Sequence, residues 1–547
     1  MLSLVAQGVL LYVVSWLLWR SLRCLRSKTD VNNVPGPKST SFIKGNLGQL
    51  FDINGWDFHD HLATQFGKVV RIFGLFESQQ LYIFDPKAIH HIIVKDQHIF
   101  EETESFFASN KLAFGDGLFA THGERHRKQR KMMNPVFSNA HMRHMLPMFN
   151  DVAQKLVQVI KLKVASGARE IDMLHWMSRA ALEMIGQSGL GYSFDPLVEG
   201  AEQHPYSKSI REFVPVTYPM TFEREYLLPI LIKIGSPRFQ RFVVDMMAWK
   251  DYRRLREIIN HMDQTVTHIF EEKKRALAEG DEALKKQIGQ ANDIMSILMK
   301  ANMAAAEDDR LPDEEVLGQM STFAFAGTDT TSNALSRILH LLSIYPDVQD
   351  RLRDEITEAH KGHGELTYDE LVSLPFMDAV CRETLRLYPP VHTAVREARQ
   401  DAVLPLSVPI KGRDGREMHS IMVPKNTQVL ISILNVNRDP TLWGPDASEW
   451  KPERWLSPLP KALHDARIPG VYSHLMTFIG GGRACIGFKF SQLEMKVVLS
   501  VLVSQFRLSP SNKEIVWEMT GIVTPTLKGS SRQPQLPLTV ELVETTA

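Results

Sequence analysis

Phe478-Ile479-Gly480-Gly481-Gly482-Arg483-Ala484-Cys485-Ile486-Gly487 is the most informative segment of the chain. Its glycine run, followed by a cysteine between small residues, allows the backbone to loop closely around a bulky group. One cysteine cannot form a structural zinc site, which takes about four ligands, but a single thiolate can hold haem iron. Arg483 can help to keep the sulfur as a thiolate and can pair with an anion. The alternative is a glycine turn that carries a buried, inert cysteine.

Five positions of this segment resemble a family signature. Phe478, Gly481, Arg483, Cys485 and Gly487 match the pattern Phe-x-x-Gly-x-Arg-x-Cys-x-Gly of cytochromes P-450. Such a match is expected by chance in about one of several thousand chains of this length. The resemblance implies that these five residues bind haem, with Cys485 as the axial ligand of the iron. It also implies a mainly α fold with a smaller β portion (α+β), in which haem lies between a long central helix and the cysteine loop.

The hexapeptide Ala326-Gly327-Thr328-Asp329-Thr330-Thr331 lies near the middle of a long predicted helix. Glycine costs about 1 kcal/mol there relative to alanine, and the missing side chain would let a flat cofactor approach Ala326 and Gly327. Asp329 and Thr330 can pass protons in an apolar place. The alternative is a kinked, buried helix whose threonines bond back to carbonyls. The hexapeptide resembles the oxygen-activating stretch of the family, which implies catalytic roles for Thr330 and Asp329.

Glu383 and Arg386 are three residues apart, so they share one helix face. By itself an exposed pair of this kind contributes only a few tenths of a kcal/mol. Together with Arg454 in residues 450–455, however, the pair resembles the Glu-x-x-Arg helix and the Pro-Glu-Arg loop of the family. The resemblance implies a structural network that locks the cysteine loop against the core.

Residues 123–131 form a basic run that, taken alone, predicts a solvated helical face. The run resembles the family's Trp-x-x-x-Arg helix, whose end residues bind haem propionates. Arg130 matches that pattern, and His126 stands where tryptophan is usual, although histidine can also donate to a carboxylate. With Arg396 and Arg483, these residues are the candidates for neutralising two propionates.

An almost unbroken apolar run covers residues 2–19, and four basic residues follow it within residues 20–28. As a helix the run is about 27 Å long, which approaches the thickness of a thin bilayer. The charge asymmetry places the following residues in the cytoplasm, while a cleaved signal peptide is the weaker alternative. We therefore predict a single-pass protein of the endoplasmic reticulum membrane that faces the cytosol. Its parts are a transmembrane anchor (1–20), a basic and proline-rich hinge (21–41) and a haem-containing catalytic domain (42–547).

The 547 residues include 63 basic and 63 acidic side chains, and this neutral balance argues against binding to nucleic acid. Three cysteines cannot form a disulfide framework. The segment after Cys485 is too short for fused flavin domains, so electrons are expected from a separate NADPH-cytochrome P-450 reductase, with cytochrome b5 as an optional second partner. Candidates for a basic docking face are Arg127, Lys128, Lys131, Lys489 and Lys496, and a plain solvated face is the alternative.

The overall pattern looks most like fungal microsomal members of the family. We expect a haem-thiolate monooxygenase that inserts one atom of O₂ into a lipophilic small molecule, with a terpenoid or other secondary metabolite as the substrate class. Two alternatives are an isomerase or dehydratase that needs no O₂ and a non-enzymatic haem-binding protein. Periodicity further predicts a hairpin (69–76 and 80–84), helices from about residue 251 and over 311–344, and strands at 421–423 and 428–433.

Overall fold

The computed structural model describes residues 29–543, apart from 199, 201–203, 247–248, 281, 284–287, 289–291, 362–363 and 530–532. The predicted anchor and the first part of the predicted hinge lie outside the described residues. Within the described part of the chain, no helix is both long enough and apolar enough to cross a membrane.

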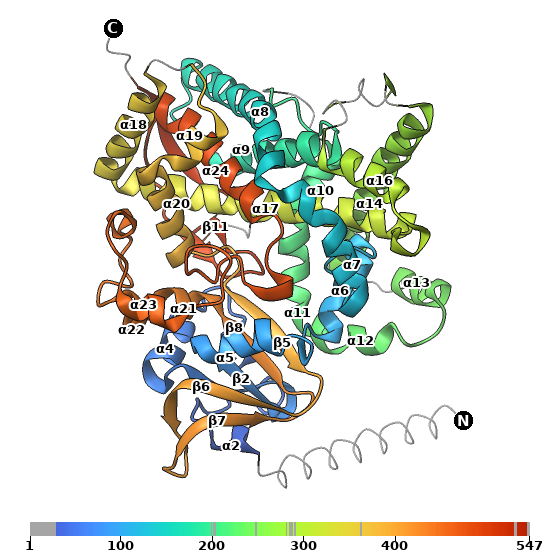
Figure 1. Ribbon diagram of the computed structural model, residues 1–547, viewed down its shortest axis with the longest axis vertical. Coiled ribbons are helices and arrows are strands. Elements are labelled where there is room, and N and C mark those ends of the chain that lie inside the picture. The colour runs from blue at the N-terminus through green and yellow to red at the C-terminus, as the bar shows by residue number, and fades with distance from the viewer. Residues whose placement is uncertain are drawn as a thin grey trace.

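A large helical body stands beside a smaller β-rich region, which forms the lower part of Figure 1. The mainly α prediction is therefore confirmed. The α-helices are α2 (Asp30–Asn33), α3 (Leu47–Leu50), α4 (Trp56–Phe66), α5 (Pro86–His90), α6 (Glu104–Phe114), α7 (Gly123–Met133), α8 (Asn139–Ala165), α9 (Met173–Met184), α10 (Pro205–Thr217), α11 (Thr221–Tyr226), α12 (Leu228–Leu231), α13 (Pro237–Met246), α14 (Lys250–Glu279), α16 (Ile294–Ala304), α17 (Asp313–Ile344), α18 (Pro346–His360), α19 (Tyr368–Ser373), α20 (Pro375–Leu387), α21 (Ile433–Arg438), α22 (Pro440–Trp443), α23 (Lys461–Ala466) and α24 (Phe488–Gln505).

The largest sheet of the described residues has five strands in the order β1-β2-β8-β5-β3. The predicted hairpin is confirmed as an antiparallel β1–β2 pair that places Val69 opposite Ile83, and β8 then joins β2 in parallel. The strands are β1 (Val69–Phe73), β2 (Gln79–Ile83), β3 (Phe100–Glu101), β4 (Glu170–Asp172), β5 (Thr393–Ala398), β6 (Ala402–Lys411), β7 (Glu417–Val423), β8 (Gln428–Ser432), β9 (Phe506–Pro510), β10 (Ile515–Glu518), β11 (Thr524–Leu527) and β12 (Pro537–Leu542).

Helix α17 is the central element, and it confirms the helix predicted over residues 311–344. Acidic residues in its first turn, such as Asp313, suit the positive end of the helix dipole, and Pro346 begins the next helix. Most of its side chains are buried. Close backbone approach explains Gly318, because a Cβ there would lie 2.4 Å from the backbone nitrogen of Gly117.

The described part of the predicted hinge, residues 29–41, packs on the body of the protein. Val31 and Val34 are buried, and the backbone N–H of Arg71 donates to the carbonyl oxygen of Pro35 at 2.9 Å. This segment is therefore part of the packed structure, and the proposed boundary at residue 41 stays a prediction.

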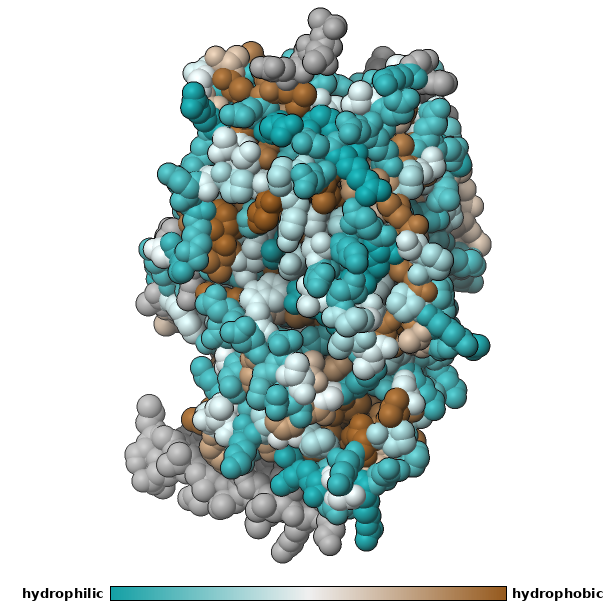
Figure 2. Space-filling view, turned by 90° about the vertical axis from the view of Figure 1, so that its left-hand side faces the viewer, coloured by the Kyte–Doolittle hydropathy of each residue, from teal (hydrophilic) through white to brown (hydrophobic). Residues whose placement is uncertain are grey.

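The face of the molecule drawn in Figure 2 is mainly hydrophilic, with separate hydrophobic patches between polar side chains. The interior contains buried polar groups as well as apolar ones. Glu383 of α20 is fully buried, and its carboxylate accepts hydrogen bonds from Nε and Nη2 of Arg386, each at 2.8 Å. It also accepts from the indole N–H of Trp455 at 3.0 Å and faces Nε of Arg454 at 3.4 Å.

This carboxylate network continues to the cysteine loop. Nη1 of Arg386 donates to the carbonyl oxygen of Asn437 at 2.9 Å. The Asn437 side chain then accepts from the backbone N–H of Met476 and donates to the hydroxyl of Thr477, both at 2.9 Å. The residues that precede Phe478 are thus held through Asn437 to helix α20.

We predict that Glu383→Gln lowers the free energy of unfolding by about 3–5 kcal/mol, because two buried guanidinium groups lose their common anion. Chemical denaturation monitored by circular dichroism measures the change. Arg351→Ala is the matched control, since Arg351 pairs with Glu453 at 2.9 Å while both side chains are about half exposed. Loss of that pair costs below about 1 kcal/mol. Equal losses in the two variants would contradict the central role of Glu383.

Candidate active site around the Cys485 loop

The glycines of the Cys485 loop are explained by close packing. A Cβ on Gly481, which has φ +67°, would lie 1.8 Å from the carbonyl oxygen of Ile93, and one on Gly480 would lie 1.5 Å from that of Pro469. Gly480 and Gly481 thus admit neighbouring backbone, whereas a Cβ on Gly487 would meet nothing within 4 Å. That the glycine run also makes room for a bulky group stays a prediction.

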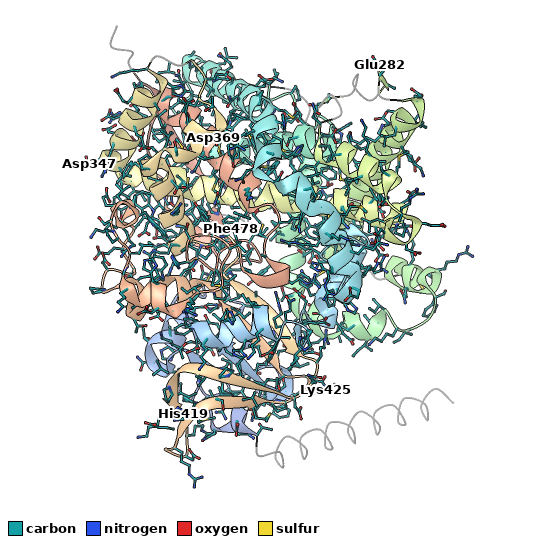
Figure 3. The ribbon with its side chains drawn as sticks, viewed as in Figure 1. Glu282, Asp347, Asp369, His419, Lys425 and Phe478 are labelled. Atoms are coloured by element: carbon teal, nitrogen blue, oxygen red, sulfur yellow. The ribbon has the colours of Figure 1, made fainter. Side chains whose placement is uncertain are left out.

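In the view of Figure 3, Phe478 at the start of the Cys485 loop lies near the middle of the molecule, between the helical body and the β-rich region. The backbone N–H of Cys485 donates to the carbonyl oxygen of Phe478 at 2.9 Å, which closes the loop.

The Cys485 side chain is exposed, yet desolvation by the surrounding protein raises the pKa of its thiol. The backbone N–H of Gly487 and the charge of Arg130 oppose the rise in pKa. Arg130 is the cation whose charge lowers the pKa of this thiol, and its guanidinium also donates to the carbonyl oxygen of Ala484. The role expected for Arg483 beside the sulfur stays a prediction.

Arg483 instead joins a buried charge cluster. Its Nε lies 3.2 Å from a carboxylate oxygen of Glu102, and Nη2 of Arg396 lies 3.2 Å from the other. The Arg483 guanidinium also donates to the carbonyl oxygens of Leu118 and Thr121, at 3.1 and 2.8 Å. The predicted propionate partners Arg396 and Arg483 thus lie together, and Glu102 joins them.

His126 lies in the same neighbourhood. Burial, together with the charges of Arg483 and Arg130, lowers the pKa of His126 to about 3. The imidazole is therefore neutral at physiological pH and retains one N–H donor. This cluster holds more positive than negative charge, which suits a ligand that brings its own acidic groups, as haem does.

Helix α7 connects the cysteine loop to the central helix through Gln129. The Gln129 side chain donates to the carboxylate of Glu315 in α17 at 2.6 Å. It also accepts from the hydroxyl of Thr121 at 2.9 Å, and the carbonyl of the same threonine accepts from Arg483. These polar contacts fix the position of the loop relative to α17.

One face in the middle of α17 stays partly accessible inside an otherwise buried helix. Its residues are Phe325, Ala326, Gly327 and Thr330. The Thr330 hydroxyl donates back to the carbonyl oxygen of Ala326 at 2.8 Å, which is the local arrangement that the structural alternative predicted. A Cβ on Gly327 would lie 3.1 Å from the Ile185 side chain. Gly327 therefore serves helix packing, and its contact with a cofactor stays a prediction.

Asp329 is buried next to this accessible face. Burial raises the pKa of its carboxyl from 3.8 to about 7, and the positive charge of Arg211 in α10 opposes that rise. Arg211 itself lies 3.0 Å from Nδ1 of His175. No local sequence pattern links Arg211 in α10 to Asp329 in α17, so the sequence did not predict Arg211. In the same way, no local pattern links Glu102 to Arg396 and Arg483.

Lys496 is one of the candidates for a basic docking face, and the structure corrects this expectation because Lys496 is buried. It is 3% exposed, and its ammonium group pairs with Asp378 at 2.8 Å. Lys128 donates to the carbonyl oxygens of Asp308 and Arg310, at 2.6 and 2.9 Å.

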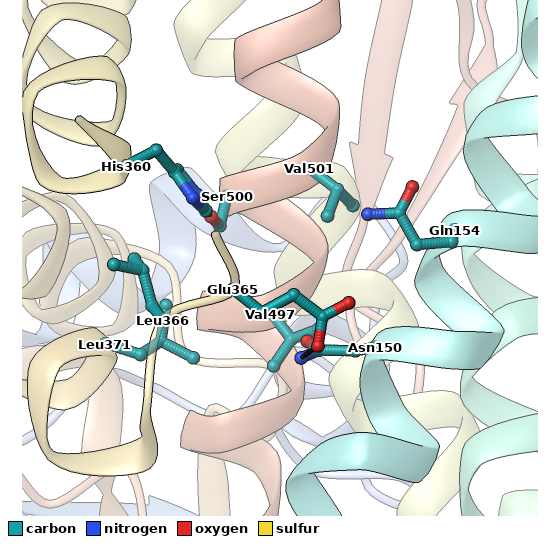
Figure 4. A pocket seen from close by; sticks show the side chains of 9 residues that line it. All are labelled: Asn150, Gln154, His360, Glu365, Leu366, Leu371, Val497, Ser500 and Val501. Carbon is teal, nitrogen blue, oxygen red and sulfur yellow. Dashed lines mark hydrogen bonds between the residues drawn. The ribbon is translucent and has the colours of Figure 1, made fainter. Parts of the chain in front are cut away.

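A small pocket between α8, α24 and the segment after α18 contains none of the predicted site residues (Figure 4). It is lined by Asn150, Gln154, His360, Glu365, Leu366, Leu371, Val497, Ser500 and Val501. Its volume of about 30 Å³ suffices for about one water molecule. We assign it no functional role.

Comparison with known proteins agrees with this architecture. The family model described as Cytochrome P450 matches residues 34–531. Cytochrome P450 monooxygenase 91 from Postia placenta is 53% identical over 98% of this chain and 99% of its own. Cytochrome P450 monooxygenase 212 from the same fungus is 51% identical over 96% and 97% of the two chains. Ganoderic acid synthetase from Ganoderma lucidum is 42% identical over 96% and 97%.

The chain belongs to the cytochrome P450 family, and its enzyme class is that of a haem-thiolate monooxygenase. The resemblance that the sequence analysis drew from Phe478–Gly487 is confirmed, as are the haem cofactor and the enzyme class. The roles of individual residues stay predictions.

We predict that Arg396→Gln accelerates haem loss about tenfold, because a charge-assisted hydrogen bond contributes about 1.5–3 kcal/mol. Transfer of haem to excess apomyoglobin measures the rate. Arg399→Gln is the control, because Arg399 pairs with Glu397 and Glu101 at the end of the same strand. If both variants lose haem at the same rate, Arg396 does not hold a propionate.

Proposed function

We propose that this monooxygenase inserts one atom of O₂ into a lipophilic terpenoid-type metabolite, with electrons from NADPH through a separate reductase. The buried Asp329 carboxyl beside the accessible face of α17 is the observation that carries the proposal. With haem bound, the prosthetic group supplies the chemistry of O₂ activation, and the protein supplies the ligand, the protons and the pocket.

In this proposal Cys485 holds the iron, and Phe478, Gly481 and Gly487 shape the loop around it. The backbone N–H of Gly487 stabilises the negative charge of the sulfur. The cationic side chains near the loop, together with His126, hold the propionates of haem. They are Arg130, Arg396 and Arg483.

Asp329 and Thr330 handle protons. A carboxyl group with a pKa of about 7 is present in both protonation states near neutral pH, so it can take up a proton and release it again. Arg211 provides a charged neighbour on the side of α10. The Thr330 hydroxyl, whose hydrogen is held by the Ala326 carbonyl, offers its lone pairs to the accessible face.

Aromatic residues beside this face support a lipophilic substrate. The rings of Phe114 and Phe325 stack with centroids 4.8 Å apart, and Phe213 lies 5.3 Å from Phe114. Phe323, also in α17, packs on Phe137 and is buried away from these rings. An apolar wall built from α6, α10 and α17 suits a hydrocarbon skeleton.

An exposed apolar surface on α12, α13 and the adjoining residues supports entry of the substrate from a membrane. Its large side chains are each about 40% exposed or more. They are Leu227, Ile230, Leu231, Ile234, Phe239, Phe242, Met246 and Trp249. Contiguous exposed apolar side chains of this kind are typical of a surface that contacts a membrane or another protein. The endoplasmic reticulum remains the proposed location.

The relative named Ganoderic acid synthetase supports a role in metabolite synthesis. Precursors of the metabolite in that name are therefore the first compounds to screen, together with NADPH, NADPH-cytochrome P-450 reductase and cytochrome b5. Turnover without O₂ and NADPH would instead favour the isomerase alternative.

We predict that the reduced, CO-bound protein shows a strongly red-shifted Soret band that Cys485→Ser abolishes, because only the thiolate donates enough electron density to the iron. Absorption spectra of membranes that carry each variant provide the measurement. Cys381→Ser is the control, because Cys381 is buried in α20 and burial raises its pKa to about 12. A Soret band that survives in Cys485→Ser would overturn the assignment of the ligand.

We predict that Asp329→Asn lowers kcat about 100-fold and changes its pH dependence. The protonated carboxyl is the donor, so the wild-type rate falls as the pH rises through about 7. The amide side chain of the Asp329→Asn variant does not titrate, so the kcat of this variant is expected to be constant over that pH range. Asp329→Glu retains a carboxyl and is expected to keep the alkaline decrease.

NADPH consumption coupled to product formation, followed from pH 5.5 to 8.5, measures both quantities. The same raised pKa means that wild-type stability declines between pH 4 and 7 relative to Asp329→Asn, because ionisation of the buried carboxyl disfavours the folded state. An unchanged alkaline decrease in Asp329→Asn would assign the proton donor to another group.

A further inference from the structure

A second pocket of about 340 Å³ lies between α4, the end of α17, the end of α20 and strand β10. It contains none of the residues that the haem site uses. Two arginines and three aromatic residues line it: Arg337, Arg438, Trp56, Tyr388 and Trp517. Its volume is in the range of small-molecule sites.

Arg337 is the unusual member of this pocket. It is 8% exposed, and its Nε is buried without a hydrogen-bond partner. Its guanidinium makes no ion pair with the described residues. The Tyr388 and Trp517 rings cover it, with centroids 4.2 and 3.6 Å from Cζ. Leaving this Nε–H donor without an acceptor in a buried place is costly.

Arg438 adds a second positive charge beside the first. Its Cζ lies 5.3 Å from the same Tyr388 ring and 5.4 Å from the ring of Trp56. Its Nε and Nη2 both donate to the carbonyl oxygen of Leu387, and no carboxylate of the described residues forms an ion pair with it. The two guanidinium groups therefore face one pocket with uncompensated charge.

The surrounding titratable groups do not neutralise these arginines. His340 accepts a hydrogen bond from the Trp517 indole at 3.0 Å, and burial lowers its pKa to about 4, so it is neutral. Asp60 lies on α4, is exposed and acts on Arg438 only at a distance. Burial lowers the pKa of both guanidinium groups.

The aromatic walls are held in place by hydrogen bonds. The Trp56 indole donates to the carbonyl oxygen of Trp517 at 2.8 Å, which ties α4 to β10. Fixed rings of this kind offer flat apolar surfaces for stacking.

We propose that this pocket binds a small organic anion whose carboxylate or phosphate head pairs with Arg337 and Arg438 and whose flat apolar body lies against the aromatic rings. Planar guanidinium groups favour such oxyanions because they donate two parallel hydrogen bonds. The site is separate from the proposed oxidation chemistry and does not depend on it.

The test uses the full-length, haem-loaded protein in saturating imidazole, which keeps the haem pocket filled. Isothermal titration calorimetry with benzoate measures binding, and acetate serves as a head group without a flat body. We expect benzoate to bind at least about tenfold more tightly than acetate, and Arg337→Met to weaken benzoate binding about tenfold or more.

Arg351→Met is the matched control, because Arg351 also stacks on a ring, that of Phe376 at 4.0 Å, but outside this pocket. It is expected to bind benzoate like the wild type. If Arg337→Met fails to retain haem, Trp56→Leu provides the second variant, with a smaller ratio of benzoate to acetate affinity expected. Absence of benzoate binding to the wild type, or equal binding to Arg337→Met and the wild type, would show that Arg337 only packs against the rings.

Discussion

The buried carboxylate of Glu383 is the interaction on which the rest of the site depends. A single anion without solvent contact must be compensated, and it is compensated by Arg386 of the same helix and by Arg454 and Trp455 from a distant segment. Separating Glu383 from Arg454 and Trp455 would leave a buried charge without a partner, which costs several kcal/mol. This cost holds the loop after α22 against helix α20. Asn437 extends the same order to the residues that precede Phe478.

Burial also sets the chemistry of the site. The same desolvation raises the pKa of Asp329 to about 7 and lowers the pKa of His126 to about 3, because each group is pushed toward its neutral form. An acid that exchanges protons and a neutral imidazole donor therefore arise from one physical cause. Glu102 shows the opposite solution, in which a carboxylate is buried between Arg396 and Arg483.

Helix α17 unites three environments along its length. Its first turns carry Glu315, which contacts α7, and its middle carries the accessible face with Thr330. Its last turns carry Arg337 within the aromatic pocket. The 32 residues of α17 are long enough to reach all three places. The helix thereby places the cysteine loop, the proton-handling residues and the anion pocket in a fixed relation.

Local sequence was sufficient for the family, the helix of residues 313–344, the hairpin of β1 and β2 and the pair of Glu383 and Arg386. It also predicts Cys485 as the ligand of haem iron. These depend on spacing within one segment, where periodicity and motif are direct signals. Only the tertiary structure revealed that Gly481 admits the backbone of Ile93, that the charge of Arg130 lowers the pKa of the Cys485 thiol, and that Lys496 is buried. Only the tertiary structure also revealed the positions of Glu102 and Arg211, and that Arg337 and Arg438 line one pocket. Each of these depends on contacts between segments far apart in the chain, and burial and charge proximity leave no pattern in the local sequence.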